Sequence, residues 1–289
     1  MKVIRFLLGA LLVVCLTLAV FVFNISSFSK TENMEKTIEN TDLLTEVNKI
    51  RNSGKVGNQS ALSSVIDDVY ATAEEYGISD KLVDTVIDSK AMKEALGKAA
   101  GNVTDYVVNG VETPILTNED LYKVAEDNID DWIKESGIEV TDNQRDKILE
   151  GSKEFIPIVV DNLPTSSELA ADYESEVDAV QTVFSTPVKV MLVVVSIILI
   201  ILLVILGRKN MRWAANLGTS LLVSGLITLG LAFVLPDLIM MVPSSSDISF
   251  ITNSITDYMF RPILISGGVM IGLCILLFVF YNVFRKKSA

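Results

Sequence analysis

Histidine is absent from the 289-residue sequence, and its two cysteines, Cys15 and Cys274, each lie inside a long apolar run. Without an imidazole, neither a Ser-His-Asp nor a Cys-His nucleophile can be assembled, and zinc lacks both its nitrogen ligands and a cluster of thiolates. No disulfide can staple the polar part of the chain, so that part must be stabilised by its own core. These absences exclude several hydrolase and metalloenzyme chemistries.

Charged residues are also missing from the middle of every long apolar run. The mean hydropathy of +0.45 is too high for an ordinary soluble domain and too low for a transporter that is nearly all membrane. The apolar residues gather in four runs, each near the ~20 residues that cross a bilayer: residues 6–23, 188–206, 214–235 and 262–284. We predict four transmembrane helices. Because a proton or ion path usually contains a buried charge, its absence argues against a transporter.

Lysine and arginine mark one end of each predicted span. The flanking segments 1–5, 207–213 and 285–289 contain eight basic and no acidic residues: Lys2, Arg5, Arg208, Lys209, Arg212, Arg285, Lys286 and Lys287. By the positive-inside rule, these topology determinants place both termini and the turn in the cytoplasm. We therefore predict a multi-pass protein of the cell membrane in which residues 24–187 and the loop 236–261 lie outside.

The first apolar run has two interpretations. Lys2 and Arg5 before residues 6–23 are typical of a signal peptide as well as of a membrane anchor. The residues directly after the run, Phe21 to Ile25, offer no small-residue cleavage site, although Ser26 and Ser27 follow soon after. We favour an uncleaved signal anchor.

The predicted outer domain, residues 24–187, is strongly acidic. It holds 33 acidic and 14 basic residues, a net charge of −19. This charge disfavours nucleic acid and anionic lipid headgroups, and favours cationic peptides, a basic protein or divalent cations. A solvated acidic surface that only keeps the domain soluble is the simpler interpretation.

Apolar residues in the outer domain recur with helical spacing, which predicts an all-α bundle inserted between the first two spans. Ser79, Thr117, Thr141 and Thr165 are predicted helix starts, the last two with capping-box spacing. Pro157 should kink or break its helix, and a small hairpin is an alternative around residues 106–116. We predict helices at residues 31–50, 61–76, 80–89, 91–109, 118–136, 142–162 and 166–185, with linkers at 52–60 and 110–117.

Small residues on the third and fourth spans predict close helix packing. Ser220, Ser224 and Thr228 recur every four positions on one face, and Gly268-x-x-x-Gly272 forms a second small face. Such faces let helix backbones approach, so spans three and four are the expected tight pair. A polar path lined by Asn216 and the Ser/Thr stripe is the alternative interpretation.

The loop 236–261 has helical apolar spacing in its second half, with Asp247 as the expected cap. An amphipathic helix on the outer membrane surface and a segment docked against the outer domain are equally favoured.

Other motifs carry little chemistry. The acidic cluster from Glu126 to Asp131 lacks the glycine and ligand spacing of a calcium loop and is interpreted as a solvated helix face. The tripeptides at Asn58 and Asn102 fit the glycosylation pattern but are discounted, since the style of the chain favours a Gram-positive bacterium. No glycine-rich phosphate loop is present, and we predict no cofactor.

Three functions compete. The leading hypothesis is a non-enzymatic envelope protein whose outer bundle binds a partner or senses a condition, with a second membrane or envelope protein, or a further copy of the chain, as its partner beside the bilayer. The alternatives are a channel or transporter subunit and a hydrolase that acts on the cell wall.

Overall fold

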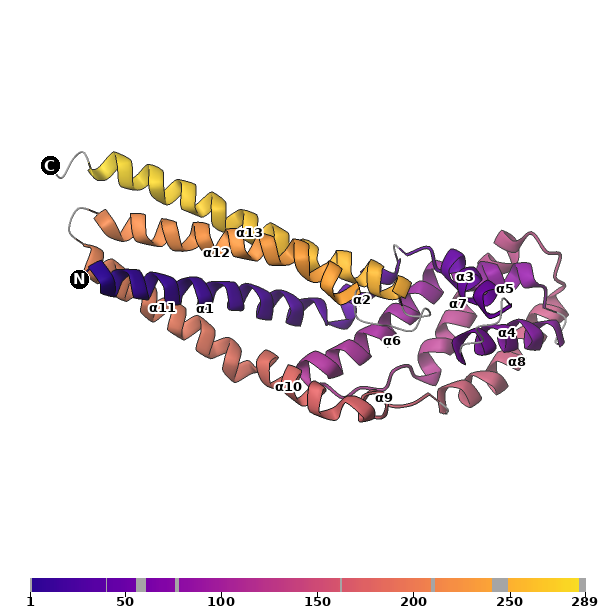
Figure 1. Ribbon diagram of the computed structural model, residues 1–289. Coiled ribbons are helices and arrows are strands. Elements are labelled where there is room, and N and C mark those ends of the chain that lie inside the picture. Colours follow the sequence, from indigo (N-terminus) through magenta and orange to yellow (C-terminus); the bar gives the residue numbers. More distant parts are fainter. Residues whose placement is uncertain are drawn as a thin grey trace. The chain divides into compact units, whose positions relative to one another are not determined.

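The structure is a computed structural model that describes residues 2–39, 41–55, 61–75, 78–161, 163–208, 211–240 and 249–285. Every regular element in these ranges is a helix (Figure 1), which confirms the predicted all-α class. The chain divides into two compact units. We call residues 1–28, 178–243 and 256–289 the apolar unit, and residues 29–177 and 244–255 the acidic domain.

The apolar unit contains four helices long and apolar enough to cross a membrane, as predicted. They are α1 (Lys2–Phe28), α11 (Thr186–Gly207), α12 (Arg212–Met240) and α13 (Ser249–Arg285), the last of which begins in the acidic domain with residues 249–255. The last two extend into the predicted loop: α12 continues through residues 236–240, and residues 249–261 form the beginning of α13, which runs on through Pro262. Asp247, the expected cap, lies outside the described residues, and the membrane-surface and docked alternatives both stay predictions.

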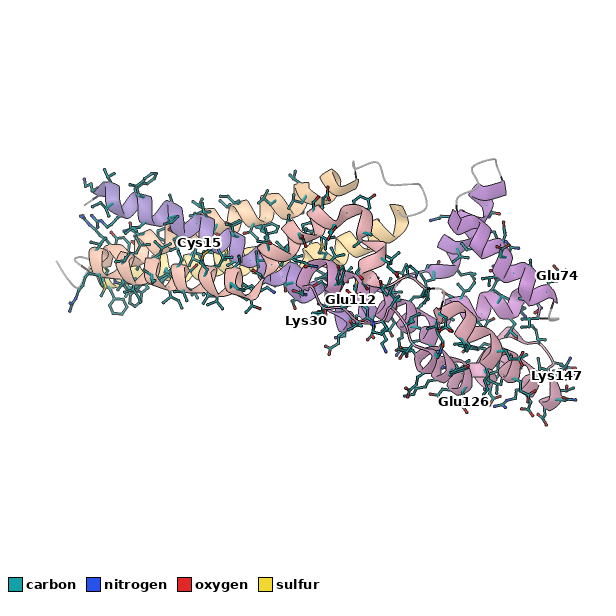
Figure 2. All side chains as sticks on the ribbon, turned by 90° about the horizontal axis from the view of Figure 1, so that it is seen from below. Cys15, Lys30, Glu74, Glu112, Glu126 and Lys147 are labelled. Atoms are coloured by element: carbon teal, nitrogen blue, oxygen red, sulfur yellow. The ribbon has the colours of Figure 1, made fainter. Side chains whose placement is uncertain are left out.

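The core of the apolar unit lies between α1, α11 and α12. Leu12 and Cys15 of α1 pack against Leu199 and Leu203 of α11 and Leu217 of α12. Figure 2 shows that the side chains of this unit are almost all carbon, with Cys15 among them, whereas oxygen and nitrogen tips gather over the acidic domain. Each unit therefore has the surface that its sequence composition predicts.

The acidic domain is built from short helices joined by brief turns. They are α2 (Thr31–Glu39), α3 (Leu43–Lys55), α4 (Ala61–Glu75), α5 (Asp80–Asp88), α6 (Lys90–Asn109), α7 (Asn118–Ser136), α8 (Asp142–Asp161), α9 (Ser166–Leu169) and η1 (Ala171–Tyr173), followed by α10 (Glu174–Phe184), which begins in this domain.

Side-chain caps begin these helices where the sequence predicts them. The Ser79 hydroxyl accepts from the Leu82 N–H, and Thr117 forms a capping box with Asp120. Thr141 and Gln144 accept from each other's backbone N–H groups, and Thr165 and Glu168 form a second capping box. Because each cap satisfies N–H groups that the helix leaves free, these starts are fixed locally.

Several features of the predicted secondary structure are wrong, among them the linker at 52–60, since α3 continues to Lys55. The helix predicted at 31–50 is two helices, since Asp42 accepts from the Thr45 N–H and starts α3 anew. The helix predicted at 166–185 is divided into α9, η1 and α10. The hairpin suggested for residues 106–116 is absent, because residues 106–109 belong to α6 and residues 110–117 contain no strand.

Pro157 does not break α8, which runs from Asp142 to Asp161 without interruption. A proline inside a helix leaves the carbonyl four residues earlier without its donor, here that of Lys153. The Tyr122 hydroxyl of α7 donates to the Lys153 carbonyl at 2.6 Å. A neighbouring helix thus replaces the missing bond.

In the acidic domain, the closest approach of two helix backbones at a described glycine is that of α2 and α6. A Cβ added at Gly97 would lie 2.4 Å from the Glu35 Cα, and one added at Gly101 would lie 2.4 Å from the Thr31 Cα. Beside them the Thr31 hydroxyl donates to the Asn102 side chain at 3.0 Å. Any larger residue at either glycine would push the two helices apart.

Candidate functional site

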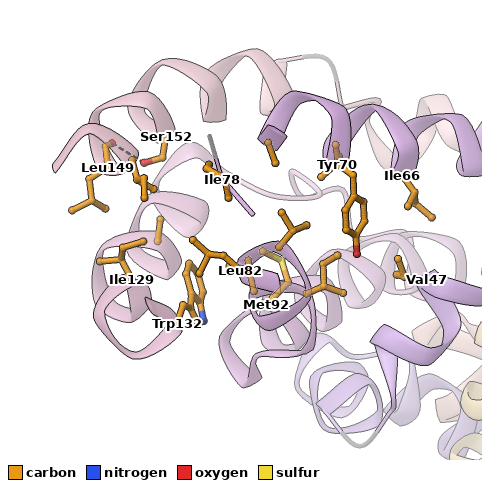
Figure 3. Close-up of a pocket in the computed structure, with 17 residues that line it drawn as sticks. Val47, Ile66, Tyr70, Ile78, Leu82, Met92, Ile129, Trp132, Leu149 and Ser152 are labelled. Carbon is orange, nitrogen blue, oxygen red and sulfur yellow. Dashed lines mark hydrogen bonds between the residues drawn. The ribbon is translucent and has the colours of Figure 1, made fainter. Parts of the chain in front are cut away.

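The acidic domain contains an apolar cavity of about 430 Å³. Its walls come from six helices, α3 to α8, and Figure 3 shows the side chains that converge on it. Tyr70 of α4, Leu82 of α5, Met92 of α6 and Trp132 of α7 are among them. A cavity of this size falls in the range of small-molecule sites, ~300–1,000 Å³.

The α5 helix forms the central wall because its apolar residues share one face. Leu82 and Val83 are buried, and Val86 also lines the cavity. Ser79 caps the start of this nine-residue helix, and Ser89 both follows its end and caps α6, since its hydroxyl accepts from the Met92 N–H. The two caps fix the turn that brings Leu82 and Met92 to the same cavity.

The two hydroxyl groups among the described cavity residues are bonded elsewhere. The Tyr70 hydroxyl donates to Asp84 Oδ1, and the Ser152 hydroxyl donates to the Leu149 carbonyl at 2.7 Å. Burial, followed by the hydrogen bond to Asp84, raises the pKa of Tyr70, so this phenol stays a protonated donor. The cavity therefore offers a ligand apolar surface and no free charge.

Arg51 contacts the ring of Tyr70 and the carboxylate of Asp67. Its guanidinium lies 3.8 Å from the centre of the Tyr70 ring, and its Nε lies 3.2 Å from Asp67 Oδ1. A cation over an aromatic face and a carboxylate beside it hold the ring in place. Because Tyr70 is only 3% exposed, this ring is a fixed part of the cavity wall.

The small polar residues predicted for helix packing are buried in the apolar unit. Ser220, Ser224 and Thr228 of α12 are 3%, 0% and 0% exposed. Ser224 shares a hydrogen bond of 2.9 Å with Thr17 of α1, and Ser220 donates to the Gly9 carbonyl at 3.2 Å. This Ser/Thr face of α12 thus contacts α1, whereas the sequence predicted that it would contact the fourth span.

The close contact between α12 and α13 lies at Gly225 and Gly267. A Cβ added at Gly225 would lie 2.9 Å from the Gly267 carbonyl oxygen. The predicted residues Gly268 and Gly272 are exposed, and an added Cβ would meet nothing within 4 Å. Since adjacent helix residues point about 100° apart, the shift by one residue moves the contact to another face.

The basic residues predicted to set topology lie at helix ends. Lys2 and Arg5 are in the first turns of α1, Arg208 follows α11, Arg212 begins α12, and Arg285 ends α13. Figure 1 shows these helix ends together at one end of the apolar unit. Lys209, Lys286 and Lys287 lie outside the described residues.

The predicted acidic face of α7 carries no assembled metal site. Glu126, Asp127, Asp130 and Asp131 are exposed, and Asp130 pairs with Arg145 of α8. In the described part of the chain, no group of three His, Cys, Asp or Glu side chains is placed to hold a metal ion. Asn102 of the glycosylation pattern is 8% exposed, and its amide donates to the Pro114 carbonyl at 2.8 Å.

Two features of the acidic domain were not predicted from the sequence. The spacing Gly97-x-x-x-Gly101 signals close helix packing as clearly as the glycines of the fourth span do. The cavity carries no such signal, because its residues come from helices spread over residues 47–152. Comparison with protein-family models, curated proteins and solved structures gives no match to this chain.

Proposed function

We propose that this chain is a non-enzymatic binding protein of the cell envelope, anchored by four membrane spans, whose acidic domain takes up an apolar ligand. The observation that carries the proposal is the cavity of about 430 Å³ walled by apolar side chains. The pocket is open to solvent, since its lining residue Val69 is 44% exposed, and contact of so much apolar wall with water is unfavourable. A bound apolar ligand offsets that cost.

The proposal places the acidic domain outside the cytoplasm. Eight basic and no acidic residues occupy the segments 1–5, 207–213 and 285–289, which supports a cytoplasmic location for these segments. Glu126, exposed on α7 and labelled in Figure 2, is a suitable reporter position. A Glu126→Cys variant should react with a membrane-impermeant maleimide in intact cells, while the native cysteines, both buried, should not. Labelling only after cell lysis would place the domain in the cytoplasm.

Ligand binding can be measured through Trp132, which lies in the cavity wall. The chain has only one other tryptophan, Trp213 of the apolar unit, so a Trp213→Phe chain isolates the signal of Trp132. In nanodiscs, a neutral apolar dye such as N-phenyl-1-naphthylamine should accept excitation energy from Trp132 with a saturable dependence on dye concentration, after subtraction of empty nanodiscs.

A matched pair of variants assigns that signal to the cavity. Ala73 lines the cavity, and Ala71 on the same helix is exposed. Ala73→Phe should fill the void and remove the saturable transfer, whereas Ala71→Phe should leave it unchanged. Equal helix content and equal unfolding midpoints establish that both variants fold. Equal transfer in the two variants would overturn the cavity as the binding site.

A further inference from the structure

The geometry points to a specific occupant: we infer that the cavity of the acidic domain holds a single hydrocarbon chain of a bilayer lipid whose headgroup carries no net negative charge. This inference rests on the proposed function and names the ligand of the same site. Four observations support it, namely the volume of the cavity, the chemistry of its walls, the attachment of the domain to helices long enough to cross a membrane, and the net charge of the domain.

The volume matches one hydrocarbon chain. A cavity of ~150 Å³ is known to take up benzene, which has six carbons, so a cavity about three times larger has room for on the order of 15 apolar carbons. The volume of about 430 Å³ therefore matches one hydrocarbon chain of about that length.

The walls select for hydrocarbon. The Tyr70 and Ser152 hydroxyls donate to Asp84 and to the Leu149 carbonyl, so neither is available to a ligand without losing a bond it already makes. Burying a charged ligand group here would leave it without a counter-charge among the described lining residues, which is strongly unfavourable. A saturated or isoprenoid chain carries no such group.

The attachment of the acidic domain to apolar helices indicates that the hydrocarbon chain comes from the bilayer. Ser29, the first residue of the acidic domain, directly follows α1, and α10 leads through Ser185 into α11. Both ends of the domain are thus joined, with almost no linker, to helices that are long and apolar enough to cross a membrane. Bilayer lipid is therefore the apolar molecule at the highest local concentration.

The net negative charge of the acidic domain limits which lipid headgroups are compatible with the site. The 33 acidic and 14 basic residues between Asn24 and Pro187 create a negative field around any headgroup left at the cavity mouth. Such a field lowers the local concentration of anions, by about tenfold or more in strongly charged sites. Neutral, zwitterionic and cationic headgroups are compatible with it.

Contact quenching by brominated lipid tests the inference. The Trp213→Phe chain is placed in nanodiscs of zwitterionic phospholipid with dibrominated acyl chains and, for comparison, in nanodiscs of the unbrominated lipid. Bromine quenches tryptophan only on near contact, so Trp132 emission should be at least halved in the brominated discs. The Ala73→Phe substitution in the same chain should restore the emission, and Ala71→Phe should not.

The Trp132→Phe chain is the internal control, because Trp213 packs within the apolar unit and should be quenched in every brominated disc. If Trp132 stays bright in brominated discs while the neutral dye still binds in an Ala73-dependent manner, the lipid inference is overturned and the proposed function stands. If Trp132 is quenched equally in the Ala73→Phe chain, the bromine reaches it from outside the cavity, and the inference is again overturned. If neither dye nor lipid responds to Ala73→Phe, the inference and the proposed function fall together.

The headgroup is tested with single-chain dibrominated ligands added to unbrominated discs. A monoacylglycerol should quench Trp132 at a concentration about tenfold below that needed for the fatty-acid anion of the same chain length. Equal potency of the two, after correction for their partition into the disc, would overturn the charge selection.

Discussion

In both units of this protein, glycine brings the backbones of neighbouring helices together. In the acidic domain, Gly97 and Gly101 of α6 meet the backbone of α2, and in the apolar unit Gly225 of α12 meets Gly267 of α13. In water, apolar burial adds to such a contact, whereas between lipid-facing helices van der Waals packing and a few hydrogen bonds must suffice. We therefore expect the same local device to stabilise the two units to different extents.

The largest effect is expected at Gly101. A Gly101→Ala substitution places a Cβ 2.4 Å from the Thr31 Cα, so α2 and α6 must separate and lose the contacts around them. We expect a loss of about 3 kcal/mol in the free energy of unfolding of the acidic domain. Urea titration of the Trp213→Phe chain in nanodiscs, followed by Trp132 emission, measures it.

Gly151 provides the control for Gly101, since a Cβ added there meets nothing within 4 Å inside α8. Gly151→Ala should raise the stability by roughly 0.5–1 kcal/mol, the usual gain when glycine is replaced inside a helix. Similar losses in both variants would contradict the close packing of α2 on α6.

A smaller effect is expected at Gly225. Gly225→Ala brings a Cβ to 2.9 Å from both the Gly267 oxygen and Ile271 Cγ1. We expect a loss of about 1–2 kcal/mol, confined to the apolar unit. Dodecyl sulfate titration of the Trp132→Phe chain, followed by Trp213 emission, reports it. Gly268→Ala should be neutral, and a larger loss there than at Gly225 would restore the packing face that the sequence predicted.

The smallest effect is expected from acid, which should lower the stability of the acidic domain and leave that of the apolar unit nearly unchanged. Burial raises the pKa of Asp120, but the hydrogen bonds from Lys98 and Thr117 outweigh it, so that the pKa lies below its usual value. A carboxylate with a lowered folded-state pKa stabilises the domain above its unfolded pKa of about 3.9, and this contribution is lost as pH falls through the folded value. The hydroxyl pair Thr17–Ser224 of the apolar unit does not titrate.

Trp132 emission should therefore report a loss of stability between about pH 5 and pH 2, while Trp213 emission should report little change. Asp120→Asn should cost less than about 1 kcal/mol at neutral pH and should make the acidic domain less sensitive to acid. Unchanged acid sensitivity in this variant would assign the effect to other carboxylates.

Local signals explain which helices could be predicted. The helix at 118–136 has the predicted bounds because Thr117 caps its start and Gly137, with a φ of 64°, ends it. The division at Asp42 was missed because apolar spacing continues across it, although Asp42 is itself a good cap. Continuity at Pro157 could not be predicted, since it depends on Tyr122 in a different helix.

The cavity could not be predicted from the sequence as the helices could. The helix at 80–89 was predicted, but its apolar face of Leu82, Val83 and Val86 is equally consistent with a filled core. Whether six helices leave a void depends on how they pack in three dimensions. The glycines of the fourth span show the same limit, because spacing identifies a small face but the partner decides whether Gly267 or Gly268 is used.

The pairing of α2 with α6 has a consequence for biosynthesis. The glycines that accept Thr31 and Glu35 come about 65 residues later in the chain, so α2 leaves the ribosome long before its partner exists. During that interval α1 is already available for insertion while the segment behind it remains unfolded. We therefore expect the first span to reach the membrane before the acidic domain closes, since α6 is synthesised later.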